Sequence, residues 1–534
     1  MNQSIVKKLQ MEYFSLVILF ASCIIFRIQV GDIGIGYLMT TYFFYEILWI
    51  IFGKNFSDIV GRMIRGKTQK GKTKAARLVW KYSFSMQLIT GIIVGAVLSI
   101  AGAFILSRGL GFTHSYFLMW LMGPIFFMRM VSEGYAGYLS GKGYELAAGF
   151  GAIIRYTIIF VMGVVLSSAV KEYGKKVAAL LKQEDFASVY GNLGILISAV
   201  VAELVVLIFL MIIRLGVKRR SSEYDDDYYQ RNENNGNVFT IVWKKRFVEG
   251  INLFFMFIPI VLIFALLRKH YETGIDLAVD LGLITGTIGA PCALFVMVGF
   301  LVAFPLASKA NRLTKRKEMR QARSVFQTGF HLSVIYSVFG ASLLIAEGSI
   351  ISSLIAGERA AEINTLYTYG AFAIILATIS IYMLRVLIMN GQGFLGLLVE
   401  IVSAVLFGIF LSVFIKSNMS VLMAVMIAIL IYFTIQTIIF AVLVIFRLDM
   451  QIDPISNIGV PVVVGVICAA FNLLLTKVIA PHLGNIFTLI FCSAEMLIVY
   501  VILLLVFRNF KDNELENIPG NRFIYALGQM LHVL

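Results

Sequence analysis

Three arginines lie inside apolar stretches of this sequence, where a charged side chain is costly to place: Arg27, Arg129 and Arg155. An ionised group in such a stretch is by default a candidate functional group, because its desolvation must be offset by a partner. The guanidinium presents a planar fork of N–H donors that matches phosphate oxygens. The pattern therefore predicts phosphate binding, and the alternative interpretation is an ion pair between neighbouring helices.

Acidic side chains occupy the same kind of stretch: Glu46, Glu133, Glu203, Glu400 and Glu495. A buried glutamate can carry a coupling proton or help to bind Na⁺, and Glu46 is the candidate for this role. Glu133 follows Arg129 by four residues, a spacing that lets the two side chains meet on one helix face. Glu133 is therefore predicted to form a structural ion pair, with a coupling role as the alternative.

The histidines and cysteines give no sign of a catalytic or metal centre. The histidines are scattered, and each of the four cysteines stands alone in an apolar stretch, as small buried thiols do. Residues 66–73 match the P-loop pattern, but a P-loop needs a preceding strand and a nucleotide-binding fold. This segment lies in a basic loop after a membrane span. We therefore expect no nucleotide, no metal ion and no enzymatic activity.

The elements that position these residues must be membrane helices. Hydrophobic residues make up 59% of the 534 residues and charged residues 14%, whereas soluble proteins average about 45–50% apolar and about 25% charged residues. Lipid must act as the solvent, and the long apolar runs without period-two alternation indicate helices. We predict an all-α integral membrane protein with about fourteen spans, at 11–30, 33–53, 82–107, 115–138, 147–169, 191–213, 248–268, 281–306, 326–346, 364–387, 395–415, 420–446, 457–478 and 486–507.

The net charge of +15 comes from basic loops, not from a nucleic-acid surface. With the N-terminus in the cytoplasm, most lysines and arginines fall on the cytoplasmic side, where the three richest loops are 54–81, 214–246 and 307–325. This positive-inside pattern predicts that both termini are cytoplasmic. The outer loops are short, and the longest is 170–190. Within the second basic loop a polar run is predicted to be disordered, and the segment after Pro519 is predicted to form a helix on the inner membrane face.

Two pairs of short motifs repeat at nearly the same offset. Residues 140–144 (SGKGY) resemble 390–394 (NGQGF), 250 residues later, and 76–80 resemble 322–326, 246 residues later. Both echoes are six spans apart, which predicts two equally oriented halves around a pseudo-two-fold axis along the membrane normal.

These halves define the predicted domain organisation. It comprises an N-lobe, a cytoplasmic linker, a C-lobe, two additional helices and a cytoplasmic tail, at 1–213, 214–247, 248–446, 447–507 and 508–534. Two lobes around such an axis can open a central cavity to either side of the membrane, as transporters do.

Three blocks of the sequence resemble a known group of transporters: Gly36-Tyr37 through Gly61-Arg62, Gly123 through Gly143, and Ala303 through Ser308. Over most of its length the chain resembles the multidrug/oligosaccharidyl-lipid/polysaccharide (MOP) exporter superfamily. Within it, the chain is similar to the stage V sporulation protein B-like polysaccharide transport proteins, which are related to the lipid II flippase. Glu133 departs from the pattern, because a basic residue is expected before Gly134-Tyr135.

The resemblance implies two lobes with alternating access, and export of an undecaprenyl-diphosphate-linked saccharide across a bacterial cytoplasmic membrane. Arg27 and Arg155 match basic positions of these proteins. Together with Arg129, whose place in an apolar stretch predicts the same role, they are the predicted ligands of the headgroup diphosphate. The implied partners are the lipid-linked saccharide, membrane lipids and envelope polysaccharide biosynthesis enzymes. We expect a monomer, no nucleic acid, and coupling to H⁺, Na⁺ or the membrane potential, which favours outward movement of anions.

Three other functions remain open. A cation-coupled multidrug or small-molecule exporter of the same superfamily would have twelve spans and an acidic cavity, so the two additional spans and the basic first lobe favour a flippase. A membrane-embedded polymerase or glycosyltransferase would need a larger outer loop with clustered carboxylates or histidines. The last alternative is a scaffold or regulator without transport activity.

Overall fold

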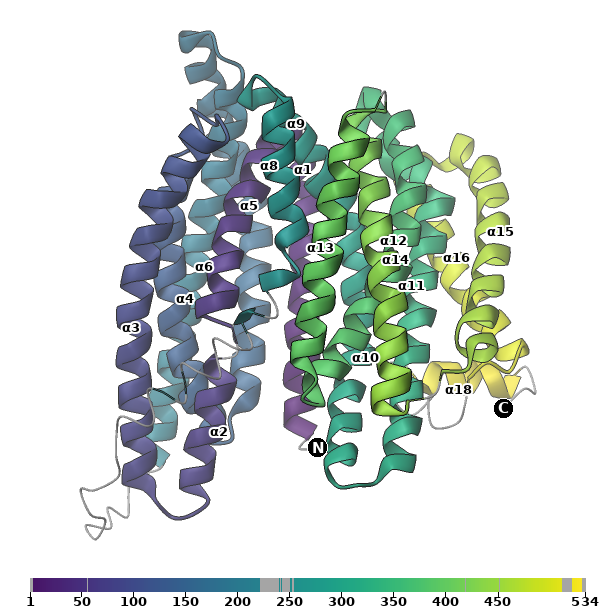
Figure 1. The fold of residues 1–534 in the computed structure, drawn as a ribbon. Helices are drawn as coiled ribbons and strands as arrows, with labels where there is room; N and C mark the ends of the chain where they lie inside the picture. Colours follow the sequence, from purple (N-terminus) through teal and green to yellow (C-terminus); the bar gives the residue numbers. More distant parts are fainter. Residues whose placement is uncertain are drawn as a thin grey trace. The chain divides into compact units, whose positions relative to one another are not determined.

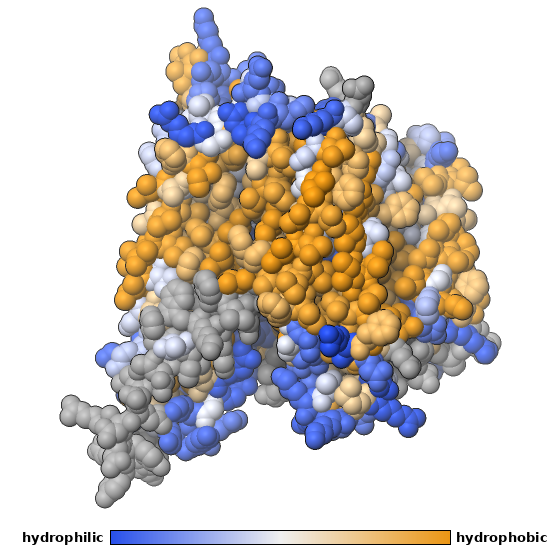
Figure 2. Space-filling model, viewed as in Figure 1, coloured by the Kyte–Doolittle hydropathy of each residue, from blue (hydrophilic) through white to orange (hydrophobic). Residues whose placement is uncertain are grey.

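The chain is a bundle of long helices, and the computed structural model describes them at residues 3–54, 56–220, 240, 242, 250–251, 254–417, 419–450, 452–510 and 521–530. These described residues contain no strand. Eleven of their helices are long and apolar enough to cross a membrane. Hydrophobic side chains cover the middle of the helices of each unit, and hydrophilic ones lie at both ends (Figure 2). The predicted all-α membrane class is therefore confirmed.

The helices fall into two compact units, Met1–Gly286 and Thr287–Leu534. The helices of unit 1 come from the N-terminal half of the chain (Figure 1). They are α1 (Gln3–Phe52), α2 (Phe56–Thr68), α3 (Thr73–Phe104), η1 (Ile105–Gly109), α4 (Leu118–Gly141), α5 (Glu145–Leu181), α6 (Asp185–Arg220), α8 (Ile258–His270) and α9 (Gly274–Gly282).

Unit 2 holds the remaining helices, which η2 (Leu283–Gly289) connects to α9. They are α10 (Ala290–Lys315), α11 (Met319–Ala356), η3 (Gly357–Arg359), α12 (Ala360–Met389), α13 (Gly393–Ile415), α14 (Val421–Leu448), η4 (Ile455–Gly459), α15 (Val460–Leu483), α16 (Asn485–Val506) and α18 (Asn521–Met530). The expected C-terminal helix is present as α18, which packs against α16. The predicted disordered run at 221–237 lies outside the described residues.

The helix α1 consists of two antiparallel runs. A straight helix of its 50 residues would be about 75 Å long, yet Lys8 at its start lies 2.5 Å from Asp58 just beyond its end. The chain reverses at Gly31, whose φ of 75° suits only glycine without strain. The predicted spans 11–30 and 33–53 are thus separate crossings within α1, and the N-terminus and α2 lie at the same end of unit 1 (Figure 1).

Two of the predicted spans are not among the eleven helices that are long and apolar enough to cross a membrane. The fourth span is α4, whose polar side chains, including Arg129 and Glu133, lower its hydropathy below that of the eleven. The seventh is represented by α8, which has 13 described residues, and the start of this span lies outside the described residues. The count of fourteen spans therefore stays a prediction.

The predicted outer connection at 170–190 is helical over most of its length, because α5 and α6 extend into it. The two helices pack against each other, and Gly174 allows the approach, since a Cβ there would lie 2.6 Å from the Cβ of Tyr190. The helices turn at Lys182, which has a φ of 55°. Polar composition indicated a loop, but the close packing of α5 on α6 extends both helices beyond the apolar stretch.

Backbone contact joins α9 to the second run of α1. A Cβ on Gly36 would lie 1.9 Å from the carbonyl oxygen of Ala278, and one on Gly282 would lie 2.0 Å from that of Asp32. A Cβ on Gly286 would lie 2.5 Å from Cγ1 of the Ile35 side chain. The small residues of Gly282-x-x-x-Gly286 thus allow the close approach of these helices. The contact also agrees with the place of α9 in unit 1. The predicted linker at 214–247 separates the two repeated halves of the sequence, which is a different division from that into compact units, and it stays a prediction.

The turns between helices support the internal repeat and correct its register. Gly143 N donates to the Ser140 carbonyl at 3.2 Å, and Gly391 N donates to the Ile388 carbonyl at 3.2 Å. The two glycines have φ values of 94° and 83°. Residues at equivalent places in the two turns are therefore 248 apart, not 250, because the positive-φ glycine that sets the turn is the second glycine of the first motif and the first glycine of the second.

The second motif keeps its offset of 246. Ala76 N donates to the Lys72 carbonyl at 3.0 Å, and Ala322 N donates to the Glu318 carbonyl at 3.0 Å. The P-loop-like segment 66–73 lies here, as the end of α2 and the turn into α3. It has no strand before it, so it lacks the geometry of a phosphate-binding loop.

Candidate functional site

Two adjoining cavities lie inside unit 1, between α1, α4, α5 and α6. The first, the apolar chamber, has a volume of about 70 Å³. The second, the polar chamber, has about 210 Å³, which is room for on the order of ten water-sized groups. Both are lined by Arg129, Arg155 and Tyr156, so two of the three predicted arginines meet where the chambers join.

Arg129 is held by aromatic side chains. It projects from α4, and its Nη1 donates to the Tyr45 hydroxyl at 3.1 Å. Its guanidinium lies 4.1 Å from the centre of the Trp49 ring and 5.8 Å from that of Tyr45, as in cation–π contacts. Its buried Nε has no hydrogen-bond partner, and no described carboxylate forms an ion pair with it. This half-buried cation lines both cavities, and its Nε is a donor without a hydrogen-bond partner.

Arg155 is paired with a carboxylate. It lies on α5, and its Nε is 2.6 Å from Oε1 of Glu203 on α6. Arg155 is 5% exposed and Glu203 1%, so the pair is shielded from water. The second oxygen of Glu203 has no hydrogen-bond partner. Arg155 therefore forms an ion pair between two helices, which was the alternative interpretation of the three arginines.

Arg27 lies apart from the other two. It forms an ion pair with Asp32 across the reversal of α1 at Gly31, and it lines neither chamber. The structure thus places the three predicted phosphate ligands in two different places. Arg27 and its partner lie at the turn, while Arg129 and Arg155 lie in the cavity.

The two predicted coupling carboxylates both line the polar chamber. Glu46 comes from α1, and its Oε2 is buried without a hydrogen-bond partner. Glu133 comes from α4. The expected ion pair between Glu133 and Arg129 is not formed between these two described side chains, because Arg129 turns toward Tyr45 and Trp49 instead.

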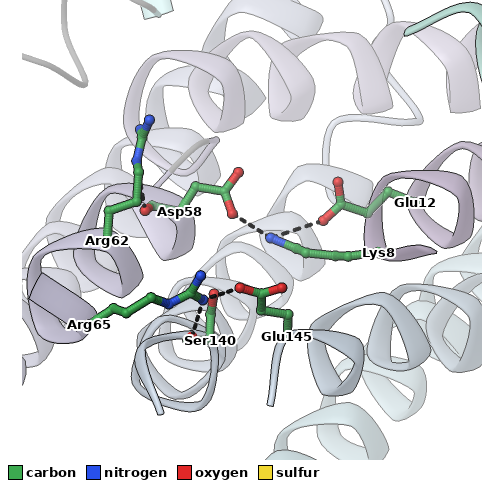
Figure 3. Close-up of polar contacts among 7 residues, drawn as sticks. All are labelled: Lys8, Glu12, Asp58, Arg62, Arg65, Ser140 and Glu145. Atoms are coloured by element: carbon green, nitrogen blue, oxygen red, sulfur yellow. Dashed lines mark hydrogen bonds and ion pairs between the residues drawn. The ribbon is translucent and has the colours of Figure 1, made fainter. Parts of the chain in front are cut away.

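The polar chamber is also lined by a buried lysine that was not predicted from the sequence. Lys8 is 4% exposed, and its amine lies between the carboxylates of Glu12, at 3.4 Å, and Asp58, at 2.5 Å (Figure 3). All three side chains line the polar chamber. The spacing of Lys8 and Glu12 is a helical ion-pair signal, but nothing in the sequence indicates that α2 returns Asp58 to the same place.

A second ion pair lies beside this cluster. The guanidinium of Arg65 on α2 binds the carboxylate of Glu145 at the start of α5, and it donates to the carbonyl of Ser140 at the end of α4 at 2.7 Å (Figure 3). Glu145 is buried. Together with Lys8 these contacts tie α1, α2, α4 and α5 at one end of unit 1.

The charges around the polar chamber are mixed. Four basic side chains and four acidic ones line it: Lys8, Lys54, Arg129, Arg155, Glu12, Glu46, Asp58 and Glu133. The predicted basic character of the first lobe therefore does not extend to this cavity as a whole. A ligand would meet a local positive charge at Arg129 and negative charges around it.

Comparison with known proteins identifies the class of fold. No family model and no curated protein matches the sequence. A multidrug resistance MATE family transporter of the MOP superfamily, in its inward-facing conformation, superposes with a TM-score of 0.60 at 13% identity, over 84% of this chain and 98% of that one. The chain therefore has the fold of MOP-superfamily transporters, as the sequence resemblance predicted.

Two further structures share this fold. The lipid II flippase MurJ, in an inward closed conformation, superposes with a TM-score of 0.59 at 14% identity, over 92% of this chain and 98% of that one. An outward-facing MATE family transporter gives a TM-score of 0.55 at 13% identity, over 84% of this chain and 94% of that one. The fold is thus shared by proteins described as a flippase and as multidrug transporters.

Proposed function

We propose that this protein exports a lipid-linked saccharide and that Arg129 binds the diphosphate of its headgroup. The observation that carries the proposal is the half-buried guanidinium of Arg129, which lines the polar chamber without a described carboxylate partner. An unpaired cation within the membrane-spanning region is costly, and a phosphate oxygen would both neutralise it and accept from its N–H donors. The chamber, of about 210 Å³, has room for a diphosphate.

Arg155 and Arg27 take supporting roles in this proposal. Each already has a carboxylate, Glu203 or Asp32, so a phosphate would have to compete for the guanidinium. Arg155 lies where the two chambers join, and Glu203 balances its charge there. The proposed substrate is an undecaprenyl-diphosphate saccharide, moved outward across a bacterial cytoplasmic membrane by alternating access, with both termini in the cytoplasm.

The extent of the structural match supports a flippase over a drug exporter. The flippase covers 92% of this chain, whereas the two MATE family transporters each cover 84%. The difference agrees with the two additional predicted helices after residue 446. Additional helices can extend the surface along which a long lipid tail lies.

The test is a flipping assay with the purified protein in proteoliposomes. Fluorescent undecaprenyl-diphosphate saccharide is the substrate, and its appearance in the outer leaflet is measured. We expect Arg129→Ala to lower the transport rate by about 10- to 100-fold, since a hydrogen bond to a charged group contributes about 1.5–3 kcal/mol. Arg129→Lys should recover part of the rate, because it keeps the charge but loses the fork.

The matched control is Arg108→Ala, which removes the same side chain from an exposed position at the end of η1. This variant should transport at the wild-type rate. A wild-type rate in Arg129→Ala would contradict the assignment of Arg129. A wild-type protein that moves none of several lipid-linked saccharides would contradict the flippase proposal itself.

A second candidate function rests on the acidic side of the same chamber. Glu46 presents a buried oxygen without a partner, and Glu12 and Glu133 line the cavity nearby. Such carboxylates suit an organic cation, and the alternative proposal is a cation-coupled small-molecule exporter in which Glu46 exchanges substrate for H⁺ or Na⁺. Export of cationic dyes that Glu46→Gln abolishes, together with absent lipid flipping, would favour it.

A further inference from the structure

A second group of buried charges lies in unit 2, far along the chain from the two chambers. Glu347 on α11 is fully buried, with 0% exposure. Its Oε2 accepts a hydrogen bond from the Ser493 hydroxyl on α16 at 2.6 Å, and its Oε1 lies 3.5 Å from the Asn472 amide nitrogen on α15. One carboxylate therefore joins three helices, two of which are the additional helices at the end of the chain.

The orientation of Asn472 is fixed, and it leaves an oxygen without a donor. Asn472 is 0% exposed, and its Nδ2 donates to the Cys492 carbonyl at 2.8 Å. Its Oδ1 is buried and accepts no hydrogen bond. The amide oxygen of Asn472 is therefore an acceptor close to Glu347, and no donor of the described residues binds it.

A second carboxylate completes the group. Glu495 on α16 interacts electrostatically with Glu347 and with the thiols of Cys468 and Cys492. Both of its carboxylate oxygens are buried and have no hydrogen-bond partner. Neither Glu347 nor Glu495 forms an ion pair with a described lysine or arginine. The ion pairs among the described residues of this unit are Arg323 with Asp449 and Arg359 with Glu362.

The depth of the group makes its charge costly. Asn472 and Glu495 lie near the middle of α15 and α16, helices of 24 and 22 residues whose outer faces expose large apolar side chains. Two uncompensated carboxylates at that depth in hydrocarbon are strongly unfavourable. Water can donate to their oxygens, but it leaves both negative charges in place, whereas a bound cation removes one of them.

We propose that Glu347, Glu495, Asn472 and Ser493 form a binding site for a monovalent cation, Na⁺ or a proton, which holds α15 and α16 against α11. Carboxylate, amide and hydroxyl oxygens are the ligands that a hard cation takes. The two carboxylates, the free amide oxygen and the hydroxyl supply several such oxygens from three helices. The site is separate from the chambers of unit 1 and does not depend on the proposed substrate.

The test is the thermal unfolding of the full-length protein in lipid nanodiscs. Na⁺ replaces choline at constant ionic strength and constant pH in one series, and pH varies without Na⁺ in a second series. A ligand that binds only the folded state raises the unfolding temperature as its concentration rises. Na⁺ binding gives a rise of a few degrees with Na⁺ in the first series, and proton binding gives a rise as pH falls in the second.

Variants assign the response to this site. Glu347→Gln and Glu495→Gln each remove one negative charge, so we expect both to unfold near the temperature of the cation-saturated wild type and to lose the cation response. Glu400→Gln is the matched control, because Glu400 is a buried glutamate of the same unit whose carboxylate accepts from Tyr432 and Gln436. The control should keep the Na⁺ response.

The other titratable groups near the site are Cys468, Cys492 and Tyr500, whose hydroxyl donates to the Ile335 carbonyl at 3.0 Å. Cys468→Ala and Cys492→Ala should therefore leave both series unchanged. The proposal would be overturned if the unfolding temperature of the wild type changed neither with Na⁺ nor with pH. A response that persists in both glutamine variants would overturn it as well. Because the readout is stability, failure of the flipping assay has no bearing on either outcome.

Discussion

Buried charges in this protein differ in whether a partner compensates them. Arg155 and Arg27 each have a carboxylate, Glu203 and Asp32. Arg129 has aromatic rings and a hydroxyl in place of one. A paired charge is consistent with a structural role, whereas an unpaired one that faces a cavity is a candidate for ligand binding.

The pair of Arg155 and Glu203 gives a prediction about stability. Arg155→Met leaves Glu203 buried and alone, so we expect a loss of about 3–5 kcal/mol in the free energy of unfolding. The double variant Arg155→Met/Glu203→Leu should recover most of that loss, because no charge then remains without a partner. Thermal unfolding in nanodiscs measures both variants. If Arg155→Met unfolds like the wild type but no longer flips substrate, Arg155 is a ligand and not a structural group.

Glycines decide how the helices of unit 1 approach one another. Gly36 and Gly282 let α1 and α9 meet backbone to backbone, and Gly31 lets α1 reverse. The turns at Gly143 and Gly391 have the same hydrogen-bond pattern, which supports two repeated halves at the level of elements.

The contact of α1 with α9 can be tested by adding one methyl group. In Gly36→Ala the Cβ would lie 1.9 Å from a carbonyl oxygen of the backbone, which cannot move aside as a flexible side chain can. We expect a destabilisation of about 1–3 kcal/mol, as in overpacked cores. Gly66→Ala is the control, since that helical position has nothing within 4 Å, and it should be neutral or stabilising by up to about 1 kcal/mol. Equal unfolding temperatures for the two variants would show that α9 can move without cost.

At the scale of the whole molecule, the fold is shared with transporters of the MOP superfamily, and the sign of the transported charge separates the two proposed functions. An inside-negative potential contributes about 2.3 kcal/mol per elementary charge per 100 mV. A diphosphate lipid and an organic cation are driven in opposite directions by it.

The voltage dependence of export is therefore a direct prediction. For a substrate with two negative charges and no co-transported ion, 100 mV favours export by about 4.6 kcal/mol, or roughly a thousandfold in the equilibrium ratio. Proteoliposomes with a valinomycin-controlled K⁺ gradient measure this dependence. Export that is insensitive to the potential, or that slows as the inside becomes more negative, would contradict the anionic substrate.

The glutamates show where prediction from the sequence succeeds and where it fails. The sequence placed Glu46 and Glu133 inside the membrane region, and both line the polar chamber. It also paired Glu133 with Arg129 from their spacing, which is wrong because the two aromatic side chains of α1 compete for the guanidinium. Helical spacing limits which residues of one helix can meet, but it carries no information on a competing partner from another helix.

Composition and the length of the apolar runs determined the class of this protein, because a chain that is 59% hydrophobic can satisfy its backbone in lipid only as helices or a closed barrel. The repeated motifs and the blocks of family resemblance likewise depend on local sequence. Only the tertiary structure decided that Lys8 and Asp58 meet, that Arg129 faces a cavity, and that Glu347 joins α11 to α15 and α16. Each of these contacts brings together residues from helices that are distant in the sequence, and the packing of those helices is a property of the folded chain that no local pattern encodes.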